Sequence, residues 1–212
     1  MGERSIESAP AEGQAFAVLL AQPGVVEVCE LRSRFGFLAF HGGGLEEVTD
    51  VVASRAAEAA GASYYGVLHP HELDVHLPSI QVSPMGSPAL ARFLDHVDVA
   101  VAIHGYGRHG WWTTLLAGGS NRPLADHLAA ALAPVLPDYE VVTDLEAIPK
   151  ELRGVHPRNP VNLPRLGGVQ LELPPRVRGR APSSPPPGPD GLSPPTAALI
   201  AGLAAAARTW PP

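Results

Sequence analysis

VDVAVAIHG, residues 97–105, is an apolar run that ends in a histidine and a glycine. Such a run predicts a buried central strand over residues 97–103. In α/β sheets, ligands bind where the loops leave the carboxyl ends of the strands. His104 follows the predicted strand directly, so the sequence places an imidazole at such a position.

The chain on both sides of this run supplies the neighbours that a central strand needs. Apolar runs of strand length cover residues 25–31, 35–40, 64–68, 140–143 and 169–173, and helical patterns cover residues 46–60, 88–96 and 121–135. Their alternation predicts an α/β fold with a mixed, largely parallel central sheet and flanking helices.

The last third of the chain is rich in proline and then in alanine. A length of 212 residues suits one core better than two. We expect a catalytic α/β domain over residues 1–180 and a Pro-rich loop or linker over residues 181–195. Residues 196–212 should form a helix that begins near Thr196 and docks on the same domain.

Charge and cysteine content narrow the function classes. The formal net charge of -6 provides no basic field for phosphates, which argues against nucleic acid as a partner. Cys29 is the only cysteine, so a metal site must use histidine and carboxylate ligands. The N-terminus lacks a secretion signal and no apolar run reaches membrane-spanning length, so we expect a cytoplasmic protein without membrane contact. The sequence carries no signal for an oligomeric state.

A glycine-rich turn separates two potential metal ligands. Residues 40–46 read FHGGGLE, in which His41 ends a predicted strand and Glu46 opens a predicted helix. Glycines allow a sharp turn and keep side chains out of the space beside His41. A carboxylate in the first helical turn is also favoured by the helix dipole. The alternative is a simple tight turn followed by an ordinary first-turn glutamate.

Two histidines that each end a predicted strand and precede a glycine favour a metal site over packed core histidines. Together with Glu46, His41 and His104 would provide two imidazoles and one carboxylate. This donor set holds catalytic zinc with one position left open.

A further candidate lies in GGVQLEL, residues 167–173. Three apolar residues alternate here with Gln170 and Glu172, which should point to the other face of a strand. Glu172 is either a solvated residue of a half-buried strand or a general base that accepts a proton from the attacking water. The pattern alone allows both roles.

Four segments in this order resemble the poly-gamma-glutamate hydrolase family, which is also labelled phage-related replication protein. They are HGGGLE, then VHLPS upstream of the strand ending in IHG, then LLAGGSN, then NPVNLPRLGGVQLELPPRVR. The resemblance covers about residues 37–178 and implies a zinc carboxypeptidase-like fold. The replication label finds no support, because the sequence has neither a nucleotide-binding loop nor a basic patch.

The resemblance assigns zinc to His41, Glu46 and His104 and the role of general base to Glu172. All four positions carry the expected residue. We therefore expect a zinc-dependent hydrolase that cleaves gamma-glutamyl amide (isopeptide) bonds, as in poly-gamma-glutamate.

A gamma-glutamyl polymer carries a carboxylate on every unit, and arginine pairs with carboxylates through two parallel hydrogen bonds. Arg165, just before the strand of Glu172, is the first candidate for substrate binding. Arg108, Arg122 and Arg158 also lie in loops that carry the motifs. At least two of the four are expected to be ordinary surface charges.

Two other functions remain open at this point. One is a zinc amidohydrolase of a small acyl-amino acid, and the other is a non-catalytic module that binds polyanionic peptide. An open groove flanked by arginines would favour a polymer, whereas a closed pocket with one arginine would favour a small substrate. The intact ligand set and Glu172 weigh against the non-catalytic module.

Overall fold

The computed structural model describes residues 12–182 and 184–211. Residues 1–11, on which the expectation about a secretion signal mainly rests, lie outside the described residues. Residue 183 of the predicted Pro-rich loop and residue 212 of the predicted C-terminal segment do so too. Among the described residues, no helix combines the length and the apolarity that crossing a membrane requires.

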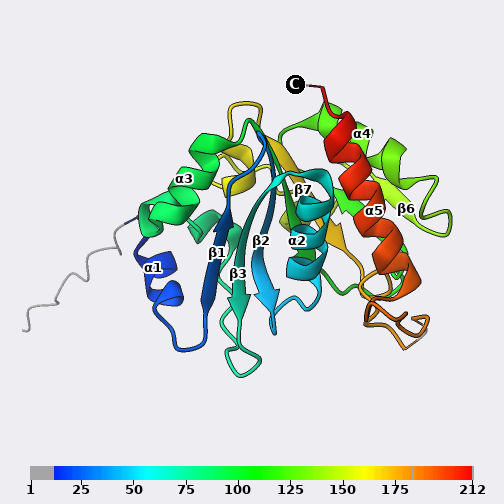
Figure 1. The fold of residues 1–212 in the computed structure, drawn as a ribbon, viewed down its shortest axis with the longest axis horizontal. Helices are drawn as coiled ribbons and strands as arrows, with labels where there is room; N and C mark the ends of the chain where they lie inside the picture. Colours follow the sequence, from blue (N-terminus) through cyan, green and yellow to red (C-terminus); the bar gives the residue numbers. More distant parts are fainter. Residues whose placement is uncertain (1–11, 183, 212) are drawn as a thin grey trace, which may run out of the picture.

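A seven-stranded sheet forms the centre of the molecule, in the order β1-β3-β2-β4-β7-β5-β6 (Figure 1). Parallel pairing joins β3, β2, β4 and β7, and also β5 and β6, whereas β1 and β5 pair with the central group in the antiparallel sense. The predicted mixed, largely parallel sheet is therefore confirmed. The strands are β1 (Val26–Glu30), β2 (Phe35–Gly43), β3 (Ser63–His69), β4 (Val99–Gly105), β5 (Thr114–Ala117), β6 (Glu140–Val142) and β7 (Gly168–Leu173).

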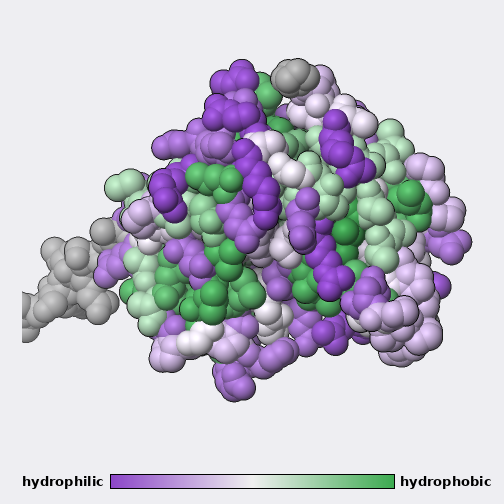
Figure 2. Space-filling view, viewed as in Figure 1, coloured by the Kyte–Doolittle hydropathy of each residue, from purple (hydrophilic) through white to green (hydrophobic). Residues whose placement is uncertain are grey.

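Helices cover both faces of this sheet (Figure 1). The pair α1 (Gln14–Leu20) and α3 (Pro88–His96) packs on one face, and α2 (Thr49–Ala60), α4 (Arg122–Leu132) and α5 (Pro194–Thr209) pack on the other. The last helix, α5, contacts both α2 and α4. On the face shown in Figure 2, hydrophilic side chains interrupt the apolar patches, as on an ordinary water-facing surface.

Two large clusters of buried apolar side chains lie on the two faces of the sheet, because successive residues of each strand point to opposite faces, and a small third cluster contains Tyr106, Leu116 and Ile148. Phe37, Val101 and Leu171 belong to the cluster beneath α2, α4 and α5, and Leu38 and Ala102 belong to the cluster beneath α1 and α3. The sheet is thus buried on both sides, as expected for parallel strands.

Local signals explain which helix boundaries could be predicted. Residues 88–96 form α3 as predicted, since Ser87 caps the helix by accepting a hydrogen bond from the Leu90 amide. The prediction that Glu46 opens a helix is wrong, because α2 begins at Thr49. Val48, with a φ of 79°, occupies the left-handed region before α2, and the chain cannot continue as a helix through it. Neither α1 nor the four-residue β5 was predicted.

Candidate metal centre

The carboxyl ends of three neighbouring parallel strands bring the candidate residues together. His41 lies near the end of β2, His104 near the end of β4, and Glu172 near the end of β7. His104 and Glu172 are register partners on adjacent strands. The prediction that ligands gather at the carboxyl edge is consistent with this placement.

A break in the strand register directs His41 to the same side as His104. The pairing of β2 with β3 shifts between Ala39 and Gly42. The regular alternation of side chains between the two faces of the sheet is therefore interrupted at Phe40 and His41. Such bulges re-aim side chains and are common beside functional sites. His41 and His104 consequently approach to 5.1 Å between ring centroids.

The glycine-rich turn then brings Glu46 back toward His41. The Glu46 amide donates to the His41 carbonyl at 2.7 Å, which closes the turn. Gly43 has a φ of 68°, and a side chain there would place its Cβ 2.4 Å from the His69 carbonyl oxygen. A residue with a side chain would therefore open the turn that positions Glu46.

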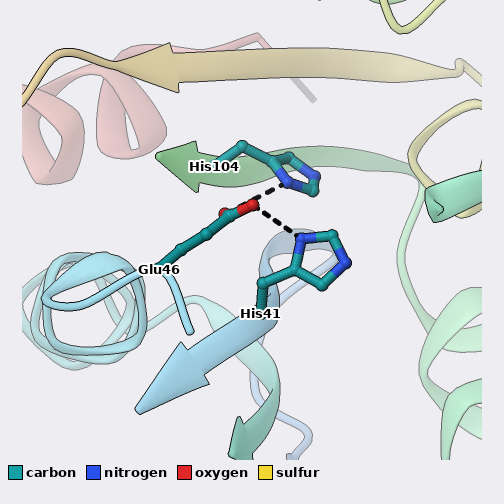
Figure 3. Close-up of side chains that lie close together, drawn as sticks. All are labelled: His41, Glu46 and His104. Atoms are coloured by element: carbon teal, nitrogen blue, oxygen red, sulfur yellow. Dashed lines mark hydrogen bonds and ion pairs between the residues drawn. The ribbon is translucent and has the colours of Figure 1, made fainter. Parts of the chain in front are cut away.

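The carboxylate of Glu46 lies between the two imidazoles (Figure 3). Its Oε1 is 2.8 Å from His41 Nδ1, and its Oε2 is 3.4 Å from His104 Nδ1. The amide of Gly105 also donates to Oε2 at 2.8 Å. Donor atoms of the three side chains all lie within 4.8 Å of one another, as a single metal ion requires.

The protons on these imidazoles indicate that a cation fits the cluster. His41 Nε2 is 2.9 Å from the Leu77 carbonyl oxygen, which can only accept, so Nε2 carries a proton. Nδ1 of the same ring is 2.8 Å from Glu46 Oε1, so either a proton or a metal ion lies between these two atoms. His104 Nε2 is buried and finds no hydrogen-bond partner in the described part of the chain. Two imidazoles and a carboxylate arranged in this way fit a divalent metal ion.

Charges within the cluster oppose the effect of burial. Burial acts to raise the pKa of Glu46, but His104, His41 and His76 outweigh it and hold that pKa well below the usual value. For His104, burial favours the neutral form, yet Glu46 and then Glu172 raise its pKa above the usual value. The cluster therefore favours a negative carboxylate and positive charge beside it.

Glu172 is almost completely buried, with 4% of its surface exposed, so the alternative of a solvated strand residue is wrong. Burial, reinforced by the charge of Glu46, raises its pKa to about 7 against the opposing effects of His104 and Gln170. The Gln170 amide donates to Glu172 Oε1 at 2.8 Å, and Asn159 in turn donates to Gln170 at 2.7 Å. This chain of hydrogen bonds fixes the orientation of the carboxyl group.

Comparison with known proteins identifies the family. The family model described as poly-gamma-glutamate hydrolase matches residues 21–181. The chain belongs to the poly-gamma-glutamate hydrolase family. No functionally curated protein matches the sequence significantly.

Two solved structures share the fold of this chain. The structure of a bacteriophage poly-gamma-glutamate hydrolase superposes with a TM-score of 0.72 at 19% identity, covering 89% of this chain and 91% of that one. A zinc-free structure named YNDL-apo gives 0.60 at 22% identity over 71% of each chain. A metallo-carboxypeptidase from Burkholderia cenocepacia gives 0.48 at 13% identity over 90% of this chain and 66% of that one.

In this member of the poly-gamma-glutamate hydrolase family, the cluster opens into a hollow of about 520 Å³. His76 stands at its mouth, with its ring 4.4 Å from that of His41 and its Nε2 3.6 Å from Glu46 Oε1. Lys150 and Glu151 line the rim, and residues 154–156 and 159 form a wall. The hollow is of the size that small-molecule ligands occupy.

Arg178 is a functional candidate that the sequence reasoning missed. Its guanidinium donates to the carbonyls of Leu173, Tyr106 and Glu47 at 3.3, 3.4 and 3.1 Å, and so connects the ends of β7 and β4 to the turn before α2. It also lies against Gly105, where a Cβ would come within 2.8 Å of the guanidinium carbon. Its position five residues after the end of β7 places it at the carboxyl edge.

The four arginines predicted to bind substrate lie in different places. Arg165 pairs with Asp98 at 3.3 Å at the opposite, amino edge of the sheet, and Arg122 donates to backbone carbonyls of Ala117, Gly119 and Thr143. Neither is brought to the hollow. Arg108 pairs with Glu151 on its rim at 2.5 Å. Arg158 lines a second hollow next to it.

Proposed function

We propose that this protein is a zinc-dependent hydrolase of gamma-glutamyl amide bonds in poly-gamma-glutamate or related peptides. His41, Glu46 and His104 would hold the metal, and Glu172 would act as general base. The observation that carries the proposal is the close approach of His41, Glu46 and His104, whose potential ligand atoms lie within 4.8 Å of one another, next to the buried carboxyl group of Glu172. Zinc suits this donor set of two imidazoles and one carboxylate.

The protein side chains divide the chemistry among them. When bound, the metal would supply a Lewis acid that polarises the scissile carbonyl and makes water more acidic. Glu172, as a carboxylate, accepts a proton from the attacking water and passes it to the leaving nitrogen. Its pKa of about 7 suits both steps near neutral pH, because the group can be either base or acid there.

Neighbouring groups keep Glu172 in place for these transfers. Gln170 donates to one carboxylate oxygen, which leaves the other free to face the hollow. Asn159 holds Gln170, and Arg178 connects the loops around the cluster. Pre-organised groups of this kind lower the reorganisation needed during the reaction.

The substrate class rests on family membership and on charge at the hollow. The bacteriophage structure is that of a poly-gamma-glutamate hydrolase, and its fold extends over nearly the whole of this chain. Lys150 lines the hollow and makes no hydrogen bond or ion pair through its side chain with any described residue. A free ammonium group there can bind a carboxylate of the polymer.

The decisive experiment combines metal analysis with a choice of polymer. Purified protein would be assayed for bound zinc by elemental analysis, and for cleavage of gamma-linked and alpha-linked polyglutamate by chromatography of the products. We expect near-stoichiometric zinc and cleavage of the gamma-linked polymer alone. Bound zinc without cleavage of either polymer would indicate that the site acts on a different amide substrate. Cleavage by protein that contains no metal would refute the proposed role of the metal.

A further inference from the structure

A second hollow of about 560 Å³ lies beside the one that contains the cluster. The same two chain segments line both. Residues 78–80 face the first hollow and residues 80, 81 and 83–85 the second, with Ile80 shared between them. In the other segment, residues 154–156 face the first hollow and Pro157 and Arg158 the second. The two hollows are therefore neighbours that meet at Ile80.

The walls of the second hollow are held in place by hydrogen bonds and close packing. Asn162 donates to the carbonyls of Gly154 and His156 at 2.7 and 3.0 Å, which fixes the loop that carries Arg158. On the other wall, Gly13 approaches Gly86 so closely that a Cβ would lie 2.5 Å from its amide nitrogen. A pre-formed hollow requires little ordering when a ligand binds, which favours affinity.

The charges at the two hollows suit a chain of carboxylates. Arg158 is exposed, and its guanidinium makes no hydrogen bond or ion pair with the described residues. The Lys150 ammonium group at the first hollow likewise makes no hydrogen bond or ion pair with the described residues. The carboxylate of Glu151 on the rim is instead paired with Arg108. Among residues 12–182 and 184–211, Glu12 is the carboxylate that lines the second hollow. Within the described part of the chain, Lys150 at the first hollow and Arg158 at the second are thus free to bind a substrate carboxylate.

We propose that the second hollow is a subsite for a gamma-glutamyl unit remote from the scissile bond, where Arg158 binds the free carboxylate of that unit. The inference rests on the proposed function and extends it. Substrate long enough to occupy both hollows gains an interaction that short oligomers lack. The pair of hollows therefore favours cleavage within long polymer over cleavage of the shortest oligomers.

The test compares oligomers of increasing length in Arg158→Gln and in a matched control. Arg55 is also an exposed arginine without a hydrogen bond or ion pair among the described residues, but it lies on α2 and lines neither hollow. For Arg158→Gln we expect kcat/KM on long gamma-glutamyl oligomers to fall by roughly fivefold, the upper effect of an exposed ion pair, with no change on the shortest cleavable oligomer. Arg158→Glu should lower it further through repulsion, and Arg55→Gln should match wild type at every length.

Binding measurements separate failure of the subsite from failure of the proposed function. Calorimetric titration of oligomers into Glu172→Gln, with and without Arg158→Gln, reports affinity without turnover. A weaker affinity for long oligomers alone supports the subsite even if wild type proves to cleave another bond. Equal affinity and equal kcat/KM at all lengths, or a loss that is the same at all lengths, would overturn it.

Discussion

The strand β4 has a charged cluster at each end, and the two clusters differ in their exposure to water. At the amino end, Asp98 pairs with Arg34 and Arg165, whose side chains are 61% and 68% exposed. At the carboxyl end, His104 is 4% exposed and lies between Glu46 and Glu172, which are also largely buried. The same strand thus has charged side chains in contact with water at its amino end and ionisable side chains buried in the core at its carboxyl end.

The difference shows which charges belong to a site. Exposed ion pairs contribute little to stability, because water solvates both partners almost as well as they solvate each other. Buried ionisable groups cost free energy unless their partners compensate them, and His104 Nε2 has no hydrogen-bond partner among the described residues. The buried cluster therefore combines two imidazoles and a carboxylate that could hold a metal ion, whereas the exposed cluster consists of ordinary ion pairs.

The largest effect should come from the buried end. Glu172→Gln keeps the shape of the side chain but removes its basicity, so kcat should fall by about a thousandfold, within the usual contribution of a general base. Metal content should stay at the wild-type level. Glu58→Gln, an exposed change on α2, serves as the control and should leave kcat unchanged.

Activity of Glu172→Gln within a few-fold of wild type would show that another group accepts the proton. Loss of metal together with activity would instead show that Glu172 acts as a ligand. Steady-state kinetics and elemental analysis on the same preparations distinguish these results.

Metal binding should raise thermal stability, and this effect should depend on His104. Zinc at about a hundredfold excess over its dissociation constant adds about 2.7 kcal/mol, which corresponds to a rise in Tm of roughly 5–10 °C for a chain of this size. His104→Ala should abolish the rise, because only His41 and Glu46 remain as ligands. Calorimetry with and without zinc measures both. An equal rise in the variant would place the metal elsewhere.

The hydrogen bond from Gln170 should set the pH range of activity. That bond stabilises the charged form of Glu172, so Gln170→Met should raise the pKa of Glu172 above its wild-type value of about 7. The base must be ionised to act, so the acidic limb of kcat/KM moves to higher pH. We expect activity to fall by about five- to tenfold near pH 6 and by less than about twofold near pH 9.

A control variant makes this pH result specific. Asn159→Ser removes the amide that holds Gln170 but leaves the Gln170 donor in place, so the limb should shift less. A uniform loss of activity at every pH in Gln170→Met would indicate disturbed packing rather than a changed pKa. The pH at which the acidic limb of kcat/KM lies, rather than the size of the activity loss, therefore tests whether the pKa of Glu172 has changed.

The ligand candidates could be predicted because each lies in a short local pattern. His41 and His104 each end an apolar strand and precede glycine, and alternation in GGVQLEL places Glu172 opposite the core-facing leucines. The burial of Glu172 could not be read from that alternation, because the residues around it, such as His104 on β4 and Asn159, which holds Gln170, come from other parts of the chain.

The arginines were harder to place, although strand direction offers a rule. In parallel strands, residues before a strand lie at the amino edge and residues after it at the carboxyl edge, where the cluster is. Arg165 precedes β7 and lies beside Asp98, whereas Arg178 follows β7 and lies beside Gly105. Nearness to a motif in sequence is therefore a weaker guide than the side of the strand on which a residue falls.

The smallest effect should come from the exposed end of β4. Asp98→Asn removes the carboxylate that Arg165 and Arg34 hold at a lowered pKa. A lowered pKa means that the pair stabilises the fold above the ordinary pKa of about 4 and ceases to do so as the carboxylate is protonated at lower pH. The decrease in Tm should thus be slight at neutral pH, disappear in acid and shrink with added salt.

Hydrolysis and zinc content should remain at wild-type levels in Asp98→Asn, since the whole length of β4 separates this residue from His104. Thermal melts at two pH values and two salt concentrations provide the measurement. A Tm loss as large as that of metal-free His104→Ala would mean that burial does not distinguish the two ends. A small decrease in Tm that disappears with added salt would show that the exposed ion pairs contribute little. The buried charges at the carboxyl end of β4 would then be the ones that serve a ligand.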